Sequence, residues 1–109
     1  MAIDIINEDT TAYLTVSFTD KDGNAAVPSS ASYRIDCLTT GQEVKDDTAL
    51  TPASSIEITL SAADNAIITQ TNAIERRLVT VWATYAGSEG VKDEYEYNLQ
   101  NMRKVPSPT

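Results

Sequence analysis

The chain has 109 residues, of which 41% are hydrophobic and 22% charged, and its 16 acidic and 8 basic side chains give a net charge of −8. This length suits one domain with a single two-layer core, and the composition excludes wholesale disorder. The negative charge repels nucleic acid and anionic lipid, so we expect neither a nucleic acid nor a membrane as partner. Its simplest role is to keep a small, β-rich surface soluble.

The first residues, 1–9, are expected to form an N-terminal arm. The opening sequence MAIDIINEDTTAYL has neither a basic start nor a sustained apolar run. We therefore expect no conventional signal peptide, and no segment of the chain is long and apolar enough to span a membrane. The protein is expected to be made in a cytoplasm.

Two strands are predicted in the first third of the domain. Apolar and polar residues alternate over 12–18 and again over 31–38, which is typical of strands with one buried face. The segments Asp20–Asn24 and Thr39–Gln42 carry the residues that favour tight turns. The core-facing residues of the two strands are expected to be Leu14, Val16, Phe18, Tyr33, Ile35 and Cys37.

The next predicted strands are weaker, except for one. Glu43–Lys45 reads as a short strand, and Thr48–Thr51 as an edge piece that Pro52 ends. Asp46 and Asp47 between them are expected in a solvated loop. Ser55–Leu60 alternates cleanly, which predicts Ile56, Ile58 and Leu60 in the core.

One segment, residues 61–68, favours a short helix that crosses between sheets. Ser61 and Asp64 have the spacing of a capping box, in which both side chains satisfy free N–H groups at the start of a helix. An irregular crossover that carries its apolar residues over the end of the sheets is the alternative. Both interpretations make the segment a connection.

A long β-hairpin is predicted over Arg76–Gln100. Its first arm, Leu78–Tyr85, is rich in β-branched and aromatic residues, and the turn Ala86–Gly90 contains two glycines. In the second arm, apolar residues alternate with Lys and Glu, so the tyrosines are expected to pack in the core or across strands rather than bind sugar. The hairpin residues expected in the core are Trp82 and Leu99.

Short strands at this spacing predict an all-β fold: a single antiparallel β-sandwich of immunoglobulin-like or fibronectin-III-like kind over residues 10–102. A small closed barrel is the competing architecture. The single cysteine, Cys37, excludes the inter-sheet disulfide of antibody domains. Residues 103–109, with two prolines, are expected to form an extended C-terminal tail.

The residue set offers no reaction centre. The chain has no histidine, so Cys37 has no activating base of the usual kind and a Ser-His-Asp triad is impossible. Asp20–Asn24 resembles the start of a calcium loop, but its glycine comes too early and no bidentate glutamate follows, so a turn is favoured. We expect a non-enzymatic protein without catalytic residues, cofactor or metal.

Candidate contact residues lie at the ends of the hairpin and of the chain. Arg76 and Arg77 could bind a partner's carboxylates, but pairing with this chain's own acids, such as Asp93 or Glu94, is favoured. The surface candidates are the hairpin tip and the basic start of the tail, namely Gly87, Ser88, Glu89, Gly90, Arg103 and Lys104.

The strand-and-turn pattern runs through three stretches: TAYLTVSFTDKDGNAAVPSSASYRIDCLTTGQEV, TALTPASSIEITLSAADNAII and ERRLVTVWATYAGSEGVKDEYEYNLQNM. From Thr10 to Met102 the chain resembles a family of small tailed-bacteriophage and prophage virion proteins. The resemblance implies an immunoglobulin-like domain in head decoration, head–tail connection or fibre attachment, present as a homo-oligomer or in many copies on the virion. It implies capsid, portal or tail subunits as partners, and no enzymatic activity or ligand residues.

A second functional class is a sandwich module that recognises carbohydrate or protein at a cell surface. Such a module predicts an exposed aromatic cluster or an acidic calcium loop. Neither is clear in this sequence.

Overall fold

The computed structural model describes residues 4–20, 22–69, 71–85 and 89–102. These ranges contain strands and turns but no helix, and so no helix that could cross a membrane. The all-β prediction is confirmed. The strands are β1 (Asp4–Asn7), β2 (Ala12–Ser17), β3 (Ser30–Cys37), β4 (Glu43–Leu50), β5 (Ser55–Leu60), β6 (Ile74–Tyr85) and β7 (Glu89–Gln100).

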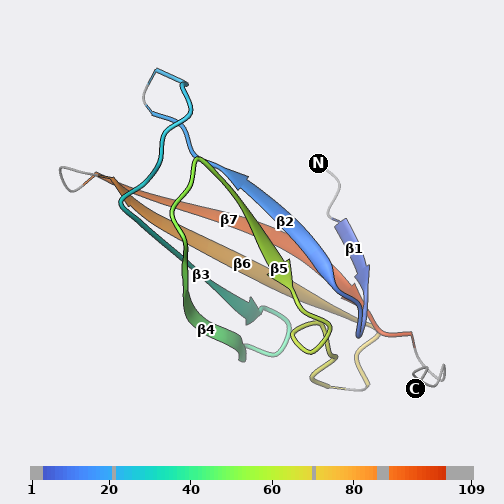
Figure 1. The fold of residues 1–109 in the computed structure, drawn as a ribbon. Helices are drawn as coiled ribbons and strands as arrows, with labels where there is room; N and C mark the ends of the chain where they lie inside the picture. Colours follow the sequence, from blue (N-terminus) through green and yellow to red (C-terminus); the bar gives the residue numbers. More distant parts are fainter. Residues whose placement is uncertain (1–3, 21, 70, 86–88, 103–109) are drawn as a thin grey trace.

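The strands form two sheets that lie one over the other (Figure 1). The larger sheet has the order β1-β7-β6-β3-β4, and the smaller one consists of β2 and β5. Neighbouring strands run antiparallel, except that β1 pairs in parallel with β7, from Asp4 opposite Tyr97 to Asn7 opposite Gln100. Part of the expected N-terminal arm is thus a strand of the larger sheet.

The β6–β7 hairpin is the longest element, and its prediction is confirmed. The two strands stay in one register from Ile74 opposite Gln100 to Tyr85 opposite Glu89. β6 begins before the predicted arm, at Ile74. Residues 86–88 of the expected turn lie outside the described ranges.

The core lies between the sheets and uses alternate residues of each strand. From the predicted set, Leu14 and Val16 are half-buried and pack against this cluster. Each fully buried aliphatic or aromatic side chain contributes about 1.5–3 kcal/mol relative to exposure. The predicted core residues that are buried are Phe18, Tyr33, Ile35, Cys37, Ile56, Ile58, Leu60 and Leu99.

The prediction that Trp82 anchors the core is wrong. On β6 the buried hydrophobic residues near it are Val79, Val81 and Ala83, so Trp82 has the opposite parity and lies on the outer face of the larger sheet, as does the buried Thr80. It is half-buried there, and the ammonium of Lys92 on β7 lies 5.9 Å from the centroid of its ring. Cation–π contact and cross-strand packing explain its partial burial.

The predicted short strand and edge piece over 43–51 are one strand, β4. Asp46 and Asp47, expected in a loop, lie within it as exposed residues. The pairing of β4 with β3 shifts register between Tyr33 and Ile35 and again next to Asp36. A bulge of this kind accommodates residues that break the alternation without ending the strand.

The predicted helix over 61–68 is absent, and the segment is a run of turns. The capping contact is present, because the Asp64 N–H donates to Ser61 Oγ at 3.1 Å. The Asn65 N–H then donates to the Ser61 and Ala62 carbonyls, but no helix follows. A single turn does not repay the cost of helix nucleation, and tertiary contacts of Asn65 and its neighbours hold the segment in its irregular path.

The two faces of the larger sheet predict different costs for truncating a large side chain. Ile35→Ala should lower the free energy of unfolding by about 2–5 kcal/mol, because Ile35 has no exposed surface. Trp82→Ala should lower it by about 1–2 kcal/mol, because Trp82 covers only the outer face. Urea unfolding followed by far-UV circular dichroism measures both, and a larger loss for Trp82→Ala would contradict the assignment of faces.

Candidate functional site

The contact candidates predicted from sequence are only partly described. Gly87, Ser88, Arg103 and Lys104 lie outside the described ranges, and Glu89 is placed only as the first residue of β7. Gly90 is exposed in β7 opposite Thr84. The role of these residues in partner contact remains a prediction. The polar clusters that the structure describes lie in other parts of the molecule.

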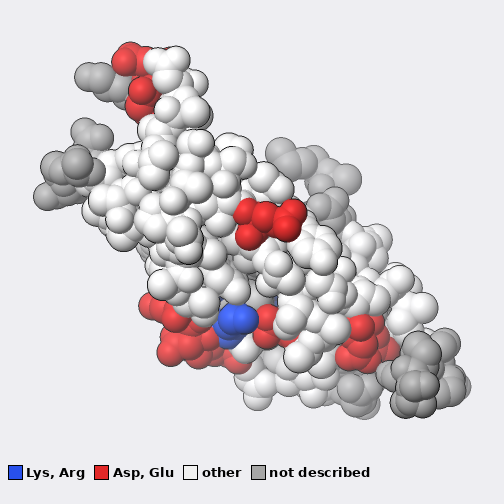
Figure 2. All heavy atoms as spheres, in the orientation of Figure 1, with Lys and Arg blue, Asp and Glu red and all other residues white. Residues whose placement is uncertain are grey.

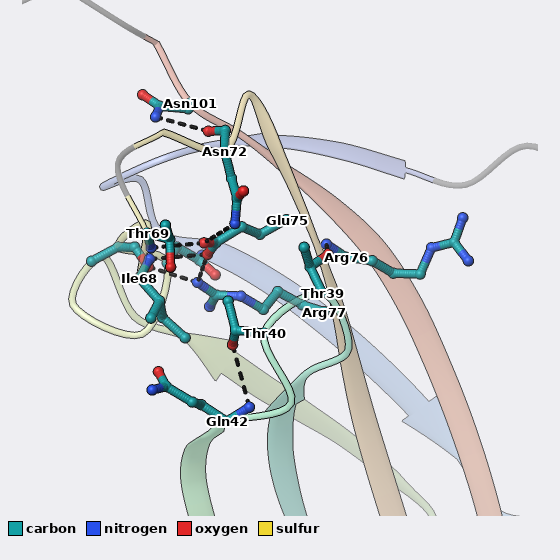
Figure 3. A network of polar contacts seen from close by, with 12 residues as sticks. Thr39, Thr40, Gln42, Ile68, Thr69, Asn72, Glu75, Arg76, Arg77 and Asn101 are labelled. Carbon is teal, nitrogen blue, oxygen red and sulfur yellow. Dashed lines mark hydrogen bonds and ion pairs between the residues drawn. The ribbon is translucent and has the colours of Figure 1, made fainter.

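The densest polar cluster surrounds the carboxylate of Glu75, which has no exposed surface (Figure 3). Its oxygens accept the N–H groups of Ile68 and Thr69 at 3.0 and 2.9 Å and the side-chain amide of Asn72 at 3.2 Å. Arg77 Nη2 completes the set at 2.9 Å. The carboxylate therefore provides hydrogen-bond acceptors for the irregular connection between β5 and β6, whose described residues are not paired as a strand.

Arg77, also without exposed surface, extends the cluster to the other part of the connection. Its Nη1 donates to the Asp64 carbonyl at 2.7 Å, and its Nη2 donates to the Ala66 carbonyl at 2.6 Å. Among the described residues, Arg77 Nε is the buried side-chain nitrogen without a hydrogen-bond partner. The guanidinium is thus committed to this chain's own backbone and to Glu75.

A second buried group, Asn65, joins the connection to both sheets. Its Oδ1 accepts the hydroxyl of Tyr97 on β7 at 2.7 Å. Its Nδ2 donates to the carbonyls of Thr10, before β2, and Leu60, at the end of β5. Asn65 therefore fixes where the ends of three strands meet.

The pKa values of Glu75 and Tyr97 are shifted in opposite directions. Burial raises the pKa of Glu75, but the N–H donors of Ile68 and Thr69 and the Arg77 guanidinium favour the ionised form, and the pKa lies below its ordinary value of 4.5. Burial raises the pKa of Tyr97 to about 12, so its hydroxyl stays protonated as a donor to Asn65. The cluster therefore keeps one fixed protonation pattern at neutral pH.

Pairing of the two arginines within the chain is observed, but with other acids than expected. Arg77 pairs with Glu75, and Arg76, half-exposed, has its Nε 3.9 Å from Glu96. The alternation of β6 indicates the burial of Glu75 and Arg77, because residues 75 and 77 share the parity of the buried Val79. Because both side chains of the buried pair lack exposed surface, this cluster is an anchor for the fold and offers no surface to a partner.

The predicted turn at Asp20–Asn24 is confirmed. Asp20 Oδ1 accepts the N–H groups of Asp22 and Asn24 at 2.9 and 3.0 Å, and Gly23 adopts a φ of 84°. Those contacts use the carboxylate within the turn. Within the described ranges, no group of three or more acidic or thiol side chains is placed to hold a metal ion.

The hollows of the described surface include the following two. One, of about 230 Å³, is lined by Leu14–Ser17 of β2, Val81 and residues Asp93–Tyr95 of β7. The other, of about 320 Å³, lies on the outer face of the larger sheet and is lined by Leu38, Thr39, Ile74, Arg76 and Asn98.

The charged side chains on the visible face are predominantly acidic (Figure 2). Several of the basic ones are paired: Arg34 with Asp36 and Glu43, and Lys45 with Asp64. The net charge of −8 therefore favours cationic partners over anionic ones.

Comparison with known proteins gives no relative: no family model, curated protein or solved structure matches this chain. The functional interpretation therefore depends on the residues and on the geometry described above.

The buried ion pair predicts a large difference between two adjacent arginines. Arg77→Met leaves the Glu75 carboxylate buried without its cation and should lower the free energy of unfolding by about 3–5 kcal/mol. Arg76→Met, the matched control, removes an exposed pair and should cost at most about 1 kcal/mol. Urea unfolding measures both. Equal losses would show that the buried pair does not hold the connection.

The depressed pKa of Glu75 predicts an acid-sensitive share of stability. The unfolded state takes up protons as the pH falls below about 4.5, before the folded state does, so this share is complete above that pH and is lost toward the folded pKa. Glu75→Gln should be less stable at neutral pH and should lose less stability on acidification than the wild type. Urea midpoints between about pH 3 and 7 test this, and Glu57→Gln, an exposed acid on β5, should keep the wild-type slope.

Proposed function

We propose that this chain is a non-enzymatic structural component of a bacteriophage virion, a capsid decoration or cement protein or a head–tail neck protein. It acts through protein–protein contacts with capsid, portal or tail subunits and is present in many copies. The resemblance of Thr10–Met102 to small virion proteins supports this class. The strand order is the structural observation that carries it.

That order supports an immunoglobulin-like sandwich. In a seven-stranded immunoglobulin domain the first, second, fourth and fifth strands share one sheet, and the third, sixth and seventh form the other. Here β2 pairs with β5, and β3, β6 and β7 are consecutive in the larger sheet with β4 at its edge. The placement of these five strands supports the sandwich that the resemblance implies, whereas β1 and β4 lie in the larger sheet instead of beside β2 and β5.

Open strand edges support assembly as the mode of action. β4 ends the larger sheet at one side, and β2 and β5 each have one neighbour in the described part of the chain. Edge strands present N–H and C=O groups that bind another chain without a specialised chemical site. An assembly protein whose partners are other subunits needs only this.

The alternative, a cell-surface recognition module, requires an exposed aromatic platform. Among the described aromatic residues, Tyr13 is 65% exposed, whereas the others are buried or half-buried. One ring offers little stacking surface for a sugar. The described surface therefore supports the assembly function more than sugar binding.

Sedimentation with phage heads tests the proposal. The purified protein should co-sediment with assembled heads that lack it. Deletion of Arg103–Thr109 should leave the unfolding midpoint unchanged and weaken incorporation, whereas replacing the same residues by a Gly/Ser segment of equal length controls for length alone. A monomer that ignores the particles and is retained on a sugar column would overturn the proposal. If the deletion variant is incorporated as well as the full chain, the tail does not contribute to the proposed contacts.

A further inference from the structure

We propose that the groove between β2 and β7 binds an extended, basic segment of a partner protein, which adds as a strand to the open edge of β2. The inference deepens the proposed function and rests on it only for the source of that segment, another subunit of the particle. It is carried by the backbone of β2, the lining of the groove and the charge at its rim.

The backbone of β2 has one side without a strand partner in the described part of the chain. β2 pairs there with β5 alone, and just after β2 the N–H of Phe18 donates to the Ser54 carbonyl at 2.8 Å. Backbone groups of alternate residues point to the same side of a strand. The N–H and C=O groups of Thr15 and Ser17 therefore point away from β5.

The groove lies on that open side. Four consecutive residues of β2, Leu14–Ser17, line it, and none of β5 does. Leu14, Val16 and Val81 give it an apolar floor that belongs to the edge of the core. A strand placed at the usual spacing of about 4.8 Å from β2 would cover this floor with every second side chain.

The wall opposite β2 is the first half of β7. The described residues of β1 pair with β7 from Tyr97 to Gln100 and so do not reach the wall at Asp93 and Glu94. The described part of β1 thus covers the edge of β7 near its C-terminal end. The groove lies farther along the same edge, next to the first half of β7.

The charge at the groove selects the occupant. Asp93 has the core-facing parity of Tyr97 and Leu99, yet it is exposed, because it lies where the groove opens. An inward-facing charge of this kind discourages pairing with an identical edge. A second copy would also bring a net charge of −8 to an acidic rim. A partner segment that places lysine or arginine beside Asp93 and Glu94 is attracted both by these carboxylates and by the negative net charge of the chain.

The expected ligand is therefore an extended segment with apolar residues at alternate positions and basic residues between them. Its probe is a nine-residue synthetic peptide in which valine alternates with lysine and threonine. The same peptide with glutamate in place of lysine tests the charge. A version with backbone N-methyl groups at alternate positions tests the hydrogen bonds.

Amide hydrogen exchange measured by NMR reads the site directly. Binding of the lysine peptide should slow exchange at Thr15 and Ser17, whose N–H groups point outward, and leave Leu14 and Val16 unchanged. The N-methyl peptide should give no protection. Protection on the outer face, around Leu38 and Ile74, or no protection anywhere would overturn the proposal.

A charge reversal separates the rim from the overall charge. Asp93→Lys should weaken the lysine peptide by about two- to fivefold at low salt and favour the glutamate peptide instead. Asp47→Lys, an exposed acid on β4 away from the groove, changes the net charge equally and should have little effect. Equal effects of the two variants would contradict the assigned rim.

Two further results distinguish the possible failures. If Thr15 becomes protected as the protein concentration rises, with a doubled mass in light scattering, a second copy fills the groove and the basic partner is wrong. If the peptide binds as expected but the protein does not co-sediment with heads, the groove stands and the virion function fails. Co-sedimentation that Asp93→Lys leaves unchanged, together with no peptide binding, would overturn the groove alone.

Discussion

The buried ion pair of Glu75 and Arg77 is the interaction on which the rest of the structure depends. Two charges taken out of water are costly unless good geometry and further hydrogen bonds satisfy them. Here the donors on Glu75 and the carbonyls on Arg77 come from the connection between β5 and β6. That connection links the two sheets, and its described residues form no helix or strand that would satisfy their backbone. The pair supplies what regular structure would otherwise provide.

Asn65 and Tyr97 extend the same constraint from one sheet to the other. Through them the connection is tied to the start of β2, the end of β5 and the inner face of β7. The chain ends of several strands are therefore fixed at one end of the molecule by polar contacts, whereas apolar packing holds its middle.

Alternation predicted most strands, and it failed where residue type was given more weight than position. Trp82, an aromatic residue, is predicted in the core, although its parity is that of the outer face. Arg77 is predicted to pair with acids such as Asp93 or Glu94, although its parity, like that of Glu75, is the buried parity of Val79. The capping contact of Ser61 and Asp64 formed, but local propensity could not reveal that the residues after it would serve the ion pair instead of a helix.

Which strands become neighbours could not be predicted from local pattern. The parallel pairing of β1 with β7 joins residues more than ninety positions apart, and nothing in DIIN distinguishes that edge from the edge of β2. Yet this choice decides which edge stays open in the described part of the chain, because a strand placed on β7 does not cover β2. The role of Asp93 depends on the same choice. Under a covering strand its carboxylate would be a buried charge, whereas on this open side it favours a basic partner segment. The candidate site thus follows from strand order, which only the three-dimensional structure provides.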